Sequence, residues 1–171
     1  MSGEIINKVD EKALITLNLE DYYNQGERVV FDIKDLLFEG LILRERDFRD
    51  FIKKHDWTRY KDCNVAVDCT ADAIIPMWAY MLISTQLKPH ATKVCVGNQS
   101  DLNRVLFTDA INAIDLEDFR DAIVMVKGCS KYPVPESAFA EISMRLADVV
   151  KTLSYGEACS KVPVYKKRIS A

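Results

Sequence analysis

The stretch NVAVDCTADAIIPMWAYMLISTQLKPHATKVCVG, residues 64–97, decides the fold. It opens with a short apolar strand over residues 64–68 and continues through an apolar segment that predicts a helix over residues 73–86. Pro89 ends this helix, and residues 93–96 predict a second strand. A strand, a helix and a strand in this order form a parallel pair that is joined by a right-handed crossover.

The same alternation continues toward the C-terminus. A helix is predicted from Ser100 to about Ile114, a third strand at residues 122–126, and a long helix that begins at Pro135 and ends near Gly156. The apolar positions of this long helix recur every three or four residues: Ala138, Ile142, Leu146, Val149 and Leu153. The pattern predicts a mixed α/β protein with a mainly parallel sheet flanked by helices.

The N-terminal third predicts another arrangement. Residues 14–19 read as a short strand, and residues 29–33 and 36–43 alternate as a β-hairpin with its turn at Lys34-Asp35. Residues 45–55 then favour a helix. No linker interrupts the 171 residues, so we predict one α/β domain over residues 1–171, with the N-terminal β-hairpin at one edge of the sheet.

Composition excludes several classes of protein. Hydrophobic residues make up 49% and charged residues 29% of the chain, which is typical of a globular protein, and the net charge of −3 argues against general nucleic-acid binding. The longest apolar run, residues 73–83, is too short to span a bilayer. The N-terminus lacks the apolar core of a signal peptide, and the five cysteines are an odd number. We therefore expect a cytoplasmic protein that binds neither nucleic acid nor membranes.

Two cysteines follow predicted parallel strands. Cys69 comes directly after the first of these strands, and Cys129 comes after the third. Ligands of open parallel sheets bind beyond the carboxyl ends of the strands, so both thiols are predicted at the functional edge. Both also precede a helix, whose N-terminus favours a thiolate, and Lys127 and Lys131 act in the same direction on Cys129.

A short repeat raises a further question. The sequence GCSKYPV of residues 128–134 returns as ACSKVPV in residues 158–164. Cys159 follows the long predicted helix, which should run toward the opposite edge of the sheet, so simple topology separates it from Cys129. The copies are either two extended edge segments that tolerate proline, or two thiols that act together. A two-fold homodimer with residues 155–165 at its interface would bring them together.

Established catalytic motifs are missing from the sequence. The six glycines are too scattered for a dinucleotide-binding or phosphate-binding loop, and neither G-x-S-x-G nor C-x-x-C occurs. His55 and His90 are isolated, and they are interpreted as surface or helix-end residues. The sequence names no reaction and favours a protein without catalytic activity.

Four stretches resemble a known family, the small bacterial family of domain of unknown function 2480, which is found mostly in Bacteroidetes. They are ERVVFDIKDLLFEGLILRERDFRDFI, ADAIIPMWAYML, VKGCSKYPVP and YGEACSKVPVYKK. The family has no assigned activity, but its genes often lie near those of the sulfur-mobilisation system, so the resemblance implies a link to iron–sulfur cluster assembly. Relatives often carry other residues at Ala158 and Lys161, whereas Cys69, Cys129 and Cys159 match the family.

Three hypotheses follow. In the first, Cys69, Cys129 and Cys159 bind zinc or an iron–sulfur cluster, with Asp72, water or a partner as the fourth ligand, in an accessory protein that contacts iron–sulfur assembly proteins. In the second, Cys129 carries a persulfide, activated by Lys127 and Lys131. In the third, the protein is a non-catalytic interaction module.

Overall fold

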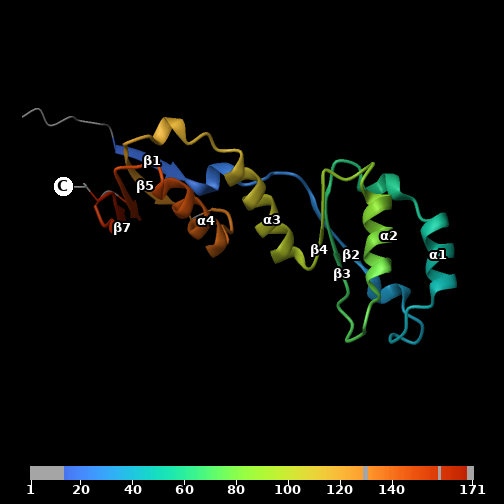
Figure 1. The fold of residues 1–171 in the computed structure, drawn as a ribbon. Coiled ribbons are helices and arrows are strands. Elements are labelled where there is room, and N and C mark those ends of the chain that lie inside the picture. Colours follow the sequence, from blue (N-terminus) through green and yellow to red (C-terminus); the bar gives the residue numbers. More distant parts are fainter. Residues whose placement is uncertain (1–13, 129–130, 158, 169–171) are drawn as a thin grey trace, which may run out of the picture. The chain divides into compact units, whose positions relative to one another are not determined.

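A computed structural model describes residues 14–128, 131–157 and 159–168 of the chain (Figure 1). The chain divides into two compact units: unit 1 consists of Met1–Tyr22 and Ile111–Ala171, and unit 2 of Tyr23–Ala110. Each unit contains its own sheet, where the sequence predicts one. The mixed α/β class with mostly parallel strands and flanking helices is confirmed, and a single folding domain over the whole chain stays a prediction.

Unit 2 is built on three parallel strands in the order β2-β3-β4. These are β2 (Arg28–Asp32), β3 (Asn64–Asp68) and β4 (Lys93–Val96). The helices that follow these strands are α1 (Glu45–Lys54), α2 (Met77–Leu87) and α3 (Gln99–Asn112). The three middle residues of the central strand β3 are apolar because both of its faces are covered: Val65 and Val67 join one core cluster, and Ala66 joins another with Leu102 and Leu106.

The predicted hairpin over residues 29–43 is not formed. Strand β2 pairs in parallel with β3, and residues 38 and 42 form only an isolated antiparallel bridge. The carboxylate of Asp32 accepts the backbone N–H of Lys34, and this cap starts a 3-10 turn over Ile33–Leu36 that carries the chain out of the sheet. The alternation that predicted a hairpin therefore belongs to a strand with a distant partner.

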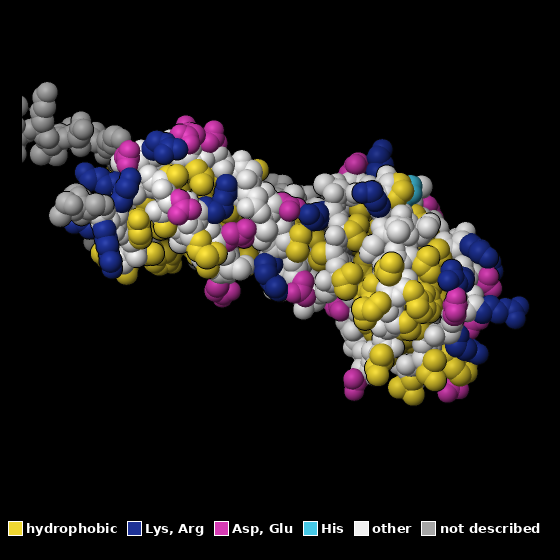
Figure 2. Space-filling view, in the orientation of Figure 1, with side chains coloured by type: hydrophobic (Ala, Val, Ile, Leu, Met, Phe, Trp, Pro, Cys, Tyr) yellow, Lys and Arg dark blue, Asp and Glu magenta, His cyan; other side chains and the backbone are white. Residues whose placement is uncertain are grey.

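Helix α2 begins later than predicted, at Met77 instead of residue 73, with Pro76 as its N-cap. Proline disfavours helical backbone in the residue before it, so Pro76 sets the start of the helix. The first seven residues of the helix are apolar on its buried and exposed faces alike: Ala79 and Ile83 are fully buried, whereas Met77 and Met81 are 71% and 67% exposed. Hydrophobic side chains accordingly gather on the surface over α2 (Figure 2).

Unit 1 is built on four strands in the order β1-β5-β6-β7. Strands β1 (Leu14–Asn18), β5 (Ile123–Lys127) and β6 (Thr152–Tyr155) are parallel, and β7 (Val162–Lys166) is an antiparallel edge strand. Helix α4 (Glu136–Ala147) buries Ala138, Ile142 and Leu146 as its apolar stripe predicts. No helix within the described residues is both long and apolar enough to cross a membrane.

The long C-terminal helix was predicted to continue past residue 150, and this prediction is wrong. Helix α4 ends at Ala147, and Thr152–Tyr155 forms strand β6 beside β5. Backbone bonds attach the segment to the start of β5, because Lys151 donates its N–H to the carbonyl of Ala122 at 2.9 Å. The added strand returns the chain to the edge where β5 ends, so Gly156 follows a strand and does not end a helix.

Candidate functional site

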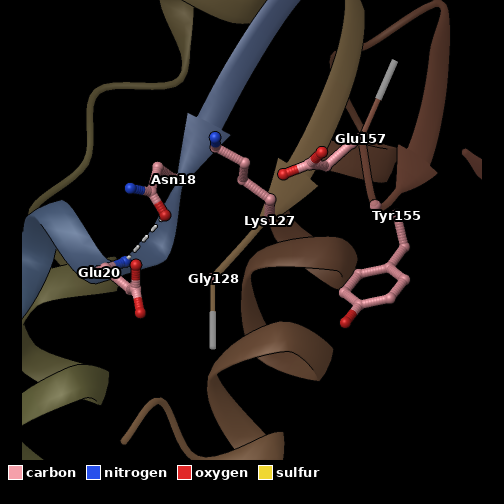
Figure 3. Close-up of a pocket in the computed structure, with 7 residues that line it drawn as sticks. Asn18, Glu20, Lys127, Gly128, Tyr155 and Glu157 are labelled. Carbon is pink, nitrogen blue, oxygen red and sulfur yellow. Dashed lines mark hydrogen bonds between the residues drawn. The ribbon is translucent and has the colours of Figure 1, made fainter. Parts of the chain in front are cut away.

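The carboxyl ends of three parallel strands meet at one edge of the unit 1 sheet. Strands β1, β5 and β6 end there in Asn18, Lys127 and Tyr155. A pocket of about 240 Å³ lies at this edge and is lined by these three residues and by the residues that follow them: Glu20, Gly128, Gly156 and Glu157 (Figure 3). Parallel α/β sheets hold their ligands at this edge.

Two glycines bring the strand exits side by side. Gly128 after β5 and Gly156 after β6 both have positive φ, 150° and 111°, which side chains on Cβ disfavour. A Cβ at Gly128 would lie 3.2 Å from the Cβ of Leu19, and the N–H of Gly156 donates to the carbonyl of Val126 at 3.0 Å. The two segments thus leave neighbouring strands side by side, and a side chain at Gly128 would be crowded by Leu19.

Glu20 fixes the segment that follows the first Cys-Ser-Lys copy. Its Oε1 atom accepts the backbone N–H groups of Lys131 and Tyr132, at 2.5 and 3.0 Å. The N–H of Glu20 is in turn 3.4 Å from the Oδ1 atom of Asn18, the contact drawn in Figure 3. Glu20 therefore positions this segment against the end of β1.

The remaining polar groups of the pocket come from β5 and β6. Lys127 forms no salt bridge with the described residues, and its side chain extends toward Asn18 in Figure 3. Glu157 is exposed and lies on the β6 side of Lys127. The ring of Tyr155 packs edge-on against Phe139 of α4, with ring centroids 5.7 Å apart. The edge therefore offers a cation, a carboxylate and a phenol in one pocket.

The second repeat copy also begins at this edge. Cys159 is exposed in a turn that the N–H of Ser160 closes onto the carbonyl of Glu157 at 2.9 Å. Cys129 lies outside the described residues, but it is the residue directly after Gly128. The predicted separation of Cys159 from the end of β5 is wrong, because strand β6, which the sequence reasoning missed, reverses the chain. The alternation of Thr152-Leu-Ser-Tyr155 before a glycine is the signal that could have found it.

The other two predicted ligands belong to unit 2. Cys69 follows β3 directly and is half-buried, with its Sγ atom 3.7 Å from the carbonyl oxygen of Ala71. Asp72 is exposed and caps no helix, because α2 begins five residues further on, after Pro76. These two residues and Cys159 therefore lie in different units, and the three-cysteine site stays a prediction. Among the described residues, no group of three or more His, Cys, Asp or Glu is placed to hold a metal ion.

Other polar and thiol groups of unit 2 stabilise the fold. Thr70 donates both its N–H and its hydroxyl to Asp32, at 3.1 and 2.5 Å. Burial raises the pKa of Asp32, but hydrogen bonds from Thr70 and Lys34 outweigh burial and lower it to about 2. Burial raises the pKa of the thiols of Cys63 and Cys95, which suits a structural role for both residues.

A family model described as Protein of unknown function (DUF2480) matches residues 3–167. The match covers nearly the whole chain, so the protein belongs to this family, as the sequence resemblance predicts. No curated protein and no solved structure matches the chain. The family description names no activity, and a function has to be argued from the site itself.

Proposed function

We propose that the protein binds a thiophilic metal, as zinc or an iron–sulfur cluster, at the carboxyl edge of unit 1. Cys129 and Cys159 are the ligands. The supporting observation is that β5 and β6 are neighbouring parallel strands, and that each is followed by a glycine and a Cys-Ser-Lys copy. Thiolates are the protein ligands that both zinc and iron–sulfur clusters prefer.

Two thiolates leave coordination positions to be filled. Glu157 lines the same pocket and forms no salt bridge with the described residues, so its carboxylate is the natural oxygen ligand for zinc, with water as the fourth. A two-fold homodimer would instead supply four thiolates, the usual set for an iron–sulfur cluster. The resemblance of the chain to its family suggests that the protein is an accessory protein that contacts iron–sulfur assembly proteins.

Metal content tests this proposal. The wild-type protein, purified without chelator and without air, is compared with C129S, C159S and C69S by elemental analysis. We expect about one zinc ion per chain, or iron with acid-labile sulfide, and loss of metal in C129S and C159S only. C95S is the matched control, since Cys95 lies within β4. Metal-free wild-type protein that also fails to take up zinc would overturn the proposal, and an equal loss in C69S would restore the three-cysteine site.

A second function is favoured by Lys127, the cation of the pocket without a salt bridge to described residues. A cation next to a cysteine stabilises the thiolate, as a persulfide carrier requires. The Cys129 thiolate would attack the outer sulfur of a donor persulfide, the donor's S–S bond would break, and the donor would leave as a thiolate.

Alkylation distinguishes this second function from metal binding. Cys129 of a metal-free carrier should react with iodoacetamide faster than a model thiol at neutral pH, and K127A should slow the reaction. If Cys129 is alkylated at the same rate as the model thiol, a persulfide-carrier function is excluded. If the folded variant with Cys69, Cys129 and Cys159 all replaced by serine keeps its cellular function, the interaction module is favoured instead.

A further inference from the structure

A second pocket of unit 1 lies between α4 and the sheet. Its volume is about 550 Å³, within the range of sites that hold small molecules. Val126 and Leu153 form part of its sheet wall, and Phe139 lies on the helix side. Val134 and Val164, the final residues of the two Cys-Ser-Lys-x-Pro-Val copies, both line it as well. The repeat thus has a structural meaning, because both copies lead from strand ends to one cavity.

The described lining of this pocket is mainly apolar and includes Val126, Val134, Phe139, Ala140, Leu153 and Val164. Ser154 also lines the pocket, but side chains alternate along a strand, so its hydroxyl lies on the face of β6 opposite Leu153 and Tyr155. The pocket therefore offers a ligand an apolar surface.

The charge of the lining selects the ligand further. Glu136, in the first turn of α4, is the one residue among the described lining that is charged at neutral pH, and none of those lining residues is a lysine, arginine or histidine. Its carboxylate forms no salt bridge with the described residues. A cationic group on the ligand complements this lining, whereas an anionic group would be repelled.

We propose that this pocket binds a small apolar amine, with the apolar body between Val134 and Val164 and the ammonium group facing Glu136. The site is separate from the thiol edge, although Tyr155 contributes to the lining of both pockets. The inference does not depend on metal binding, because none of its residues is a proposed metal ligand.

Titration calorimetry with three eight-carbon probes tests the inference: octylamine, 1-octanol and octanoate. We expect saturable binding that is tightest for octylamine and weakest for octanoate. Replacing Glu136 with glutamine should weaken octylamine binding about threefold, to the level of octanol, since exposed ion pairs contribute about 0.2–1 kcal/mol. D148N is the matched control at the other end of α4, and it should bind as the wild type does.

A pocket-filling variant locates the ligand. Ala140 is exposed on α4 and lines the pocket, so A140W should fold and should weaken octylamine binding more than tenfold. No saturable binding of any probe, octanoate binding as tightly as octylamine, or unchanged binding in A140W would each overturn the inference. A lower mass of A140W than of the wild type in light scattering would also overturn it, because the pocket would then be a contact between subunits.

Discussion

Replacing Glu20 with alanine tests whether this residue holds the first Cys-Ser-Lys segment in place. The carboxylate accepts two backbone N–H groups, from Lys131 and Tyr132, across more than a hundred residues of sequence. Hydrogen bonds to a charged group contribute about 1.5–3 kcal/mol each when buried, but the first of these bonds is exposed and the second only half-buried. We therefore expect E20A to lower the free energy of unfolding by about 2 kcal/mol in total.

The assay is urea unfolding followed by far-ultraviolet circular dichroism, together with zinc affinity measured by competition with a chelator. E20Q keeps an uncharged acceptor and should lose about half as much stability as E20A. E117A is the matched control, because among the described residues the side chain of Glu117 bonds only to Arg120, on the surface of the same unit, and E117A should lose much less stability than E20A. Zinc affinity should fall in E20A and stay unchanged in E117A. Equal stability losses in E20A and E117A, with unchanged zinc affinity in both, would refute the positioning role of Glu20.

Three further predictions concern the fold. Burial, followed by the charge of Arg59, lowers the pKa of His55. The contribution of His55 to stability is therefore present above its unfolded pKa of about 6.5 and is lost as the pH falls. The midpoint of urea unfolding should be lower at pH 5.5 than at pH 7.5 in the wild type, and the difference should be smaller in H55F. G128A should lower the free energy of unfolding by about 1–3 kcal/mol, and G40A should lower it less. Both glycines have positive φ, but of the two only Gly128 has a neighbour near the added Cβ. L146A, in unit 1, should lower the free energy of unfolding by about 2–5 kcal/mol, because Leu146 is fully buried. Both tryptophans lie in unit 2, so in a single folding domain the circular dichroism and tryptophan fluorescence transitions should shift together. Separate transitions would contradict a single domain.

Local sequence patterns predicted most of the helices and strands, but they predicted fewer of the pairings between strands. The continuous apolar run of β3 and the stripe on α4 identified both elements, because burial on two faces or on one face leaves a direct trace in sequence. The alternation of residues 29–33 says that a strand is present, but its partner is β3, more than thirty residues away. Pairing over that distance has no local signature, so a hairpin with the next residues was the nearer interpretation.

The missed strand β6 explains the main error about the candidate site. Val149 and Leu153 continue the spacing of the α4 stripe, so the short alternation of the four-residue strand was hidden within the pattern of the helix. With a helix in that place, Cys159 was expected away from the end of β5, and Val134 and Val164 could not be seen to share a pocket. The cysteines could be proposed as candidates from sequence, because their position after a strand and the repeated Cys-Ser-Lys do not depend on sheet order.

X-ray absorption at the zinc edge tests the central claim most directly, because it counts the sulfur atoms bound to the metal. The zinc-loaded wild-type protein should show two sulfur ligands at about 2.3 Å and oxygen or nitrogen ligands at about 2.0–2.2 Å. C159S should lose one sulfur, and C69S should keep both. A spectrum without sulfur ligands, or one in which C69S loses a sulfur while C159S loses none, would contradict a thiolate site at the ends of β5 and β6.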